Sequence, residues 1–361
     1  MADQHIQVPD GAQAPLPSLR WDELPDGPVL VLLDQTRLPA EEAEFVCGDV
    51  PALVRAIQTL AVRGAPLLGI AGAYGVALAA VRGEDVDEAA AALEGARPTA
   101  VNLGHGVRRA AGAHRDAVGA GAGAREAAAA ALAAAEALHR EDAEASARMA
   151  GHGLALLEEL LPAGDHRILT HCNTGRLVSG GQGTAFAVAL AAHRAGRLRT
   201  LWVDETRPLL QGARLTAYEA DAHGMAYQLL TDNAAGSLFA AGQVDAVLIG
   251  ADRIAADGSV ANKVGSYPLA VLAKYHHVPF IVVAPTTTVD LGTPDGGSIE
   301  VEQRSGQEVS GMYASHVYNP AFDVTPPELV TAVVTEEGVA SPVTMVRLAE
   351  LCARSRQVSM S

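Results

Sequence analysis

Residues 167–185 read R-I-L-T-H-C-N-T-G-R-L-V-S-G-G-Q-G-T-A. Ile168-Leu169-Thr170 is a short β-type run, Asn173-Thr174-Gly175 is a turn sequence, and three glycines then precede the apolar, helix-like run 185–190. This order of strand, glycine-rich turn and helix predicts the opening of a βαβ unit. Ligands of such parallel sheets bind outside the carboxyl ends of the strands, beside helix N-termini that favour anions. Cys172 is therefore predicted to lie at a functional edge.

Apolar runs recur at helix-length intervals beyond this stretch. They are Thr200–Val203, Tyr227–Leu230, Val244–Ile249 and Pro279–Ala284. Near-continuous apolar strands separated by helices predict a parallel sheet covered on both faces. Polar residues follow the strands at Cys172, Asp204, Asp232 and Asp252, and we expect Cys172 and Asp252 to face one cleft.

Residues 262–275 are predicted to form a helix, which would place Lys263 on its first turn. A lysine there is either a phosphate or hydroxyl ligand or a solvated charge.

In the N-terminal part, Val29–Leu33 is a predicted strand, and most of residues 50–161 are predicted to be helical. Residues 1–19 are expected to form a loose arm. Arg63, before a run of small residues, is either a surface charge or an anion ligand.

Composition excludes several classes of protein. The chain has 361 residues and a formal net charge of −16, which argues against a nucleic-acid partner. No stretch reads as a signal peptide, and the alanine-rich tract Glu126–Leu138 is too short to span a bilayer. The three cysteines show no C-x-x-C spacing and the twelve histidines no metal-binding motif. We expect a cytoplasmic protein with reduced thiols, without a metal or membrane partner.

The candidate catalytic groups allow structural alternatives. Cys172 is either a functional thiol, which nearby helix N-termini can stabilise as the thiolate, or a buried structural cysteine. A dyad with His171 is not expected, because neighbours in an extended strand point to opposite faces. Asp252 is either a general acid or base in an apolar pocket or a loop carboxylate paired with Arg253. The D-E-T-R-P segment 204–208 is interpreted as a self-satisfied charge cluster at a loop or subunit interface.

An ordered set of motifs resembles the methylthioribose-1-phosphate isomerase family. The matching stretches are Arg63-Gly64-Ala65-Pro66, Arg97-Pro98-Thr99-Ala100-Val101-Asn102, Thr170-His171-Cys172-Asn173-Thr174-Gly175, Asp204-Glu205-Thr206-Arg207-Pro208, Gln211-Gly212-Ala213-Arg214, Thr231-Asp232-Asn233, Gly250-Ala251-Asp252-Arg253-Ile254, Ala261-Asn262-Lys263 and Tyr318-Asn319-Pro320-Ala321-Phe322-Asp323. They cover roughly residues 20–350. A single motif would be weak evidence, whereas the ordered set is specific.

The resemblance implies an α/β fold and an isomerase. A small, mainly helical N-terminal domain with a few strands (1–145) would precede a Rossmann-like domain with a mostly parallel sheet (146–361), with the active site between them. A homodimer would interconvert 5-methylthioribose 1-phosphate and 5-methylthioribulose 1-phosphate in methionine salvage, without a cofactor. Cys172 and Asp252 match the catalytic positions of the family. The positions matching its substrate-binding residues are Arg63, Gly64, Ala65, Arg97, Gln211, Asn262 and Lys263.

Three departures from the family pattern concern the substrate pocket. They are Arg176 after the cysteine turn, Gln182 in the later glycine loop, and Gly104-His105-Gly106 where an aromatic residue is common. We expect them to affect the surroundings of the 5-substituent. The alternatives are therefore an isomerase of 5-deoxyribose 1-phosphate or ribose 1,5-bisphosphate. A non-catalytic relative, like the regulatory subunits of a translation-initiation exchange factor, is a third alternative, and a cysteine-nucleophile hydrolase lacks a candidate base.

Overall fold

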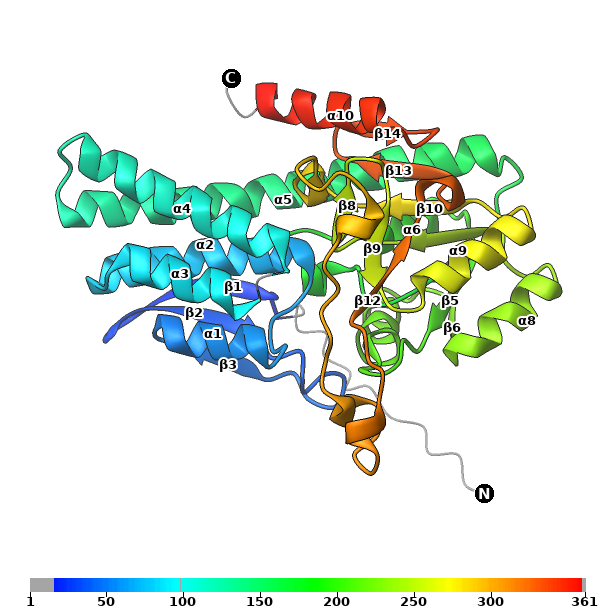
Figure 1. The fold of residues 1–361 in the computed structure, drawn as a ribbon, viewed down its shortest axis with the longest axis horizontal. Helices are drawn as coiled ribbons and strands as arrows, with labels where there is room; N and C mark the ends of the chain where they lie inside the picture. The colour runs from blue at the N-terminus through cyan, green and yellow to red at the C-terminus, as the bar shows by residue number, and fades with distance from the viewer. Residues whose placement is uncertain (1–15, 98, 359–361) are drawn as a thin grey trace.

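The computed structural model describes residues 16–97 and 99–358 (Figure 1). Residues 1–15 of the expected arm lie outside this range, and Leu19 already belongs to the first strand. A helical N-terminal part with a small sheet precedes a larger part built on a parallel sheet, which confirms the predicted fold class.

The N-terminal part combines a three-stranded antiparallel sheet with a layer of helices. The strands, in the order β1-β2-β3, are β1 (Leu19–Leu24), β2 (Gly27–Leu33) and β3 (Glu44–Cys47). The helices are α1 (Val50–Gln58), α2 (Ala65–Arg82), α3 (Val86–Ala96), α4 (Val101–Gly119) and α5 (Ala124–Leu160).

Helix α2 forms the centre of this part, and its small residues allow close packing. A Cβ atom on Gly106 of α4 would lie 1.9 Å from the carbonyl oxygen of Gly69, so the two helix backbones meet directly there.

By length and composition α2 could cross a membrane, but 78% of its residues 65–82 are buried inside the protein. This burial identifies α2 as a core helix.

Helix α5 connects the two parts (Figure 1). Ala135 and Leu138 belong to the core of the N-terminal part, whereas Ala145 and Met149 belong to the core under the parallel sheet. The buried face of one continuous helix therefore changes from one core to the other between residues 138 and 145.

The second part is built on a seven-stranded sheet in the order β14-β13-β10-β7-β4-β5-β6, parallel except for β14. Its strands are β4 (His166–Thr170), β5 (Leu198–Asp204), β6 (Tyr227–Leu230), β7 (Ala246–Ile249), β10 (Phe280–Val283), β13 (Ala332–Thr335) and β14 (Gly338–Ala340). The helices are α6 (Ala185–Arg194), α7 (Ala217–Ala222), α8 (Ala235–Ala240), α9 (Ser266–Tyr275) and α10 (Met345–Val358). Residues of α5, α6 and α7 pack on one face, and those of α8, α9 and α10 on the other, as the apolar strands predict.

A second, four-stranded sheet corrects one prediction. It has the order β11-β8-β9-β12, with β8 (Arg253–Ala255), β9 (Val260–Lys263), β11 (Val289–Asp290) and β12 (Phe322–Thr325). Residues 260–263 are therefore a strand, and the predicted helix begins only at Ser266. The prediction was wrong because β9 pairs with β12, where Lys263 lies opposite Phe322, a partner distant in sequence.

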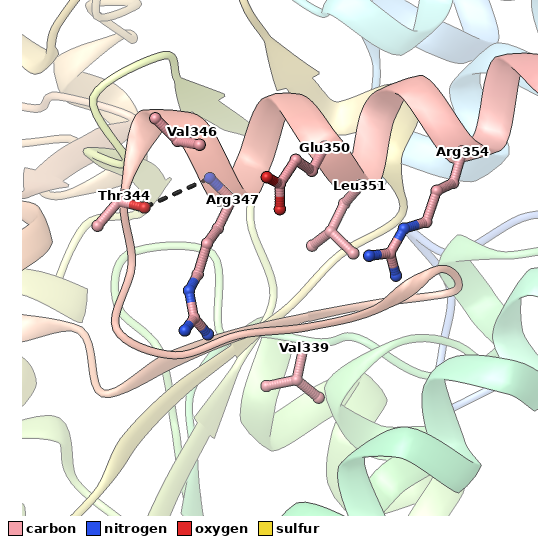
Figure 2. Close-up of a pocket in the computed structure, with 7 residues that line it drawn as sticks. All are labelled: Val339, Thr344, Val346, Arg347, Glu350, Leu351 and Arg354. Atoms are coloured by element: carbon pink, nitrogen blue, oxygen red, sulfur yellow. Dashed lines mark hydrogen bonds between the residues drawn. The ribbon is translucent and has the colours of Figure 1, made fainter.

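A cavity of about 540 Å³ lies under α10, and Figure 2 shows the residues that line it. Its lining consists of Val339, Thr344, Val346, Arg347, Glu350, Leu351 and Arg354. Neither Cys172 nor Asp252 lines it, so it is separate from the predicted site.

Candidate active site

The backbone holds Cys172 in an unusual conformation directly after β4. Its φ angle is +64°, in the left-handed region that non-glycine residues rarely adopt. Two threonine hydroxyls fix this turn: Thr206 Oγ1 accepts from the Cys172 N–H at 2.8 Å, and Thr216 Oγ1 donates to the Cys172 carbonyl at 2.6 Å. Such strain is found mainly where the surrounding structure enforces it, often at functional sites.

Arg63 contacts the sulfur of Cys172. Its Nη2 lies 3.6 Å from Cys172 Sγ and 3.3 Å from the Asn173 carbonyl oxygen, and its Nη1 donates to Asn173 Oδ1 at 3.1 Å. Asn173 in turn donates to the buried carboxyl of Glu219 at 2.5 Å. A guanidinium donor so placed complements negative charge on the sulfur. Arg63 is thus a buried residue of the site, not a surface charge.

Gly64 and Ala65 begin α2 beside this contact. Gly64 has a φ of +91°, and a Cβ atom there would lie 2.2 Å from the Cβ of Val178. Only glycine therefore lets α2 start so close to the cysteine loop.

Asp252 follows β7 and lines the same cavity as Cys172. Burial raises the pKa of Asp252, and the charges of Lys263, Arg97 and Arg63 oppose this rise only in part. The neutral acid of Asp252 is therefore favoured to higher pH than that of an exposed aspartate. Arg253 does not pair with Asp252: its side chain faces Asp290 at 3.7 Å and donates to the Thr99 carbonyl at 3.2 Å.

Strand β9 places Lys263 in the cavity and Asn262 away from it. Lys263 is buried, and its Nζ lies 5.2 Å from the ring centroid of Phe322. Burial lowers the pKa of Lys263, although Cys172 and Asp252 oppose the shift. Asn262 donates instead to Ser266 Oγ at 2.8 Å, because neighbours in a strand point to opposite faces. Of the nine predicted site residues, Asn262 is the one that lines neither cavity described next.

Two adjoining cavities make up the site. One is lined by Leu60, Arg63, Gly64, Arg97, Cys172, Leu209, Gln211, Asp252, Lys263, Arg304, Ala321 and Phe322. The other shares Arg97, Asp252 and Phe322 with it and adds Ala65. Their volumes are about 30 and about 20 Å³, room for single water molecules rather than a sugar phosphate. A ligand of that size requires the site to open.

Two buried polar atoms on the lining side chains have no hydrogen-bond partner within the described part of the chain. They are Nε of Arg97 and Oε1 of Gln211. Buried polar atoms are nearly always paired, so unpaired donors and acceptors around a cavity indicate groups that a polar ligand would satisfy.

Sequence reasoning missed a buried pair behind Cys172. His171 Nδ1 lies 3.0 Å from Asp204 Oδ2 and its Nε2 lies 2.8 Å from the Val264 carbonyl oxygen. Burial alone would lower the pKa of His171, but the hydrogen bond and charge of Asp204 and the carbonyl of Val264 together raise it. The pair connects the end of β4 to β5 and to the residue after β9.

The interpretation of residues 204–208 as a self-satisfied charge cluster was therefore wrong. Asp204 bonds His171, whereas the Arg207 side chain donates to the carbonyls of Pro208 and Val309. Asp232 accepts from the backbone N–H groups of Thr206 and Arg207, both at 2.7 Å. Ligand atoms of His171, Asp204 and Asp232 lie within 4.8 Å of one another, a spacing that histidine motifs in the sequence did not indicate.

The three departures from the family pattern lie outside both cavities. Arg176 donates to the Leu16 carbonyl at 2.8 Å and contacts Tyr218 Oη at 3.4 Å. Gln182 is exposed, and His105 lies on α4 between Gly104 and Gly106. None of the three side chains lines the space around Cys172 and Asp252.

Comparisons with known proteins show the family of the chain. A family model described as the initiation factor 2 subunit family matches residues 61–342. The chain belongs to the initiation factor 2 subunit family. Its curated relatives include the methylthioribose-1-phosphate isomerases of Klebsiella pneumoniae (48% identity, 87% of this chain and 92% of the relative) and Pelotomaculum thermopropionicum (46%, 91% and 92%).

The solved structures that are similar to this chain carry two kinds of description. The 5-methylthioribose 1-phosphate isomerase of Pyrococcus horikoshii has a TM-score of 0.82 at 36% identity, covering 93% of this chain and 96% of that one. A structure from A. fulgidus described as the delta subunit of translation initiation factor eIF-2B has a TM-score of 0.77 at 40% identity, covering 94% and 99%. Fold alone therefore does not separate an isomerase from a regulatory subunit.

Proposed function

We propose that this chain is a methylthioribose-1-phosphate isomerase, which converts 5-methylthioribose 1-phosphate to 5-methylthioribulose 1-phosphate in methionine salvage. The observation that carries the proposal is the convergence of Cys172 and Asp252 on one cavity with Arg63 and Lys263. The name of the curated relatives at 46–48% identity supports it independently.

The first step requires an acid, because an aldose 1-phosphate is locked as a cyclic acetal. In this proposal neutral Asp252 protonates the ring oxygen as the bond from that oxygen to C1 breaks. The pKa of Asp252, raised by burial, suits this role. The phosphate stays on C1 throughout.

The second step moves the proton from C2. The Cys172 thiolate, beside Arg63, takes this proton and leaves an enol between C1 and C2. The Cys172 thiol then protonates C1 while the Asp252 carboxylate accepts the proton of the C2 hydroxyl, which restores both groups. In the competing route a hydride shifts from C2 to C1, and Asp252 alone takes the hydroxyl proton.

The remaining residues bind substrate in this proposal. Arg63, Arg97 and Lys263 provide positive charge for the phosphate, and the unpaired oxygen of Gln211 accepts from a sugar hydroxyl. Gly64 and Ala65 supply the close backbone approach at the start of α2. Asn262 contributes only if β9 or Ser266 rearranges on binding, since its amide now bonds Ser266.

We also propose a homodimer that acts in the cytoplasm and a domain division at residues 145/146. The change of core along α5 between residues 138 and 145 supports that boundary. The family resemblance supports the dimer.

A regulatory subunit is the second candidate, favoured by the similarity to the A. fulgidus structure at 40% identity. Such a subunit would have no need for an acid and a thiol in one cavity, which favours the isomerase. Turnover decides between them.

The test is to add purified protein to 5-methylthioribose 1-phosphate in deuterated water and follow the ketose by NMR. 5-Deoxyribose 1-phosphate and ribose 1,5-bisphosphate serve as competing substrates. Ketose formation preferring the methylthio sugar supports the proposal, and preference for another sugar reassigns the substrate. Deuterium at C1 would favour proton transfer over the hydride route. Folded protein that turns over none of the three sugars would contradict an isomerase.

A further inference from the structure

A long connection joins β11 to β12 (Figure 1). Its residues Glu302 and Arg304 bring further charges to the candidate active site. Glu302 Oε2 accepts from Arg97 Nη2 at 3.0 Å, and Glu302 Oε1 accepts from Arg304 Nη1 at 2.8 Å. Arg304 also donates through Nε to both oxygens of Glu308, at 2.8 and 3.0 Å. The carboxylate of Glu302 thus bridges two guanidiniums that line the cavity.

These ion pairs are shielded from solvent. The side chains of Arg97, Glu302 and Arg304 are 15%, 25% and 18% exposed, and that of Glu308 is 15% exposed. Charges in such surroundings are screened less than those of surface pairs. The net charge of the side chains around this cavity therefore affects how strongly it binds anionic ligands.

The charges can be counted. Four cations line the cavity with Cys172, namely Arg63, Arg97, Lys263 and Arg304. Glu302 and Glu308 offset two of them. The other two cations, Arg63 and Lys263, form no ion pair with a carboxylate among the described residues, so they remain for a single phosphate group. A second phosphate would bring about two more negative charges to a site whose other two cations are already paired with carboxylates.

We propose that Glu302 is a specificity-determining residue that limits the site to sugars with one phosphate group. Glu302 acts through Arg97 and Arg304, whose charge it offsets, and lies behind them rather than in the cavity lining. The inference rests on the proposed function, because it concerns the substrate of that same site. It is a case of specificity by repulsion of the wrong ligand.

Binding of two matched ligands tests this without requiring turnover. Ribose 1-phosphate and ribose 1,5-bisphosphate share one sugar and differ by a phosphate, and calorimetric titration gives a Kd for each. In Glu302→Gln the Kd ratio should shift toward the bisphosphate by about tenfold, because one partly buried negative charge is removed at nearly constant side-chain size. Glu302→Asp, which keeps the charge, should shift the ratio less than Glu302→Gln.

The control is Glu328→Gln, the same chemical change at an exposed carboxylate that lines neither cavity of the site. It should leave the ratio near that of the wild type, because water screens its charge. A ratio unchanged in folded Glu302→Gln, or shifted equally in Glu328→Gln, would overturn the proposal. If the wild type turns over no sugar but Glu302→Gln still shifts the Kd ratio, the proposed isomerase function is wrong. The role of Glu302 in phosphate selection then still stands.

Discussion

Replacing His171 with glutamine should destabilise the protein strongly. The imidazole is 1% exposed and lies between the carboxylate of Asp204, also 1% exposed, and the carbonyl of Val264. Asp204 Oδ1 already lacks a partner among the described residues, so losing the imidazole leaves this buried carboxyl with little compensation. Removing one member of a buried pair typically costs about 3–5 kcal/mol, and we expect a loss in that range for His171→Gln.

The loss should also depend on pH. Because the folded pKa of His171 is raised above its unfolded value of about 6.5, the pair stabilises the protein fully below that value. This contribution declines as the pH rises through the folded pKa. The difference in unfolding free energy between wild type and His171→Gln should therefore be larger near about pH 6 than near about pH 9.

Urea denaturation at fixed protein concentration measures both quantities. His223→Gln is the control, because burial lowers the pKa of His223 and no carboxylate hydrogen bond to it is found in the described residues. A loss below about 1 kcal/mol for His171→Gln, or a loss that grows with pH, would refute the assignment of a protonated His171 paired with Asp204.

Two further predictions concern packing and pH. Gly106→Ala should lower the free energy of unfolding by about 1–3 kcal/mol, because its Cβ would lie 1.9 Å from the Gly69 carbonyl oxygen. Gly112→Ala on the same helix meets nothing within 4 Å and should stabilise by about 0.5–1 kcal/mol, so equal urea midpoints for the two variants would contradict the described helix contact. The alkaline limb of kcat/KM should follow Asp252, whose pKa is raised by burial and also by Glu302, so activity falls as the acid loses its proton. Glu302→Gln should move that limb to lower pH, and a limb that stays in place would argue against Asp252 as the acid.

The sequence predicted those strands and helices whose pattern is contained in one short stretch of residues. The apolar runs after residue 167 became strands of the parallel sheet, and the glycine-rich turn leads into α6 as expected. β9 was not recognisable because its four residues, Val-Ala-Asn-Lys, have no strong alternation. Their conformation is set by pairing with β12, about sixty residues further along the chain.

The residues of the candidate active site also divide into those that the sequence predicted and those that only the fold brings together. The ends of predicted strands indicated that Cys172 and Asp252 face one cleft, and both line one cavity. Arg63 and Arg97, which follow helices, were assigned to the site only because they match motifs of the family. Glu302 and Arg304 were missed because they lie in an irregular connection, and only the fold brings them to Arg97. His171 was set aside correctly as a partner of Cys172, but its partner Asp204 lies on another strand and could not be inferred from adjacency.

The most direct test of the central claim compares wild type with Cys172→Ser and Asp252→Asn by NMR on 5-methylthioribose 1-phosphate. Both variants keep side-chain size, so circular dichroism should show them folded. We expect wild type to form the ketose and each variant to lose at least about a hundredfold in kcat, since each removes one proton-transfer group. Ketose formation at the wild-type rate by either variant would contradict the assignment of acid and base to this cavity.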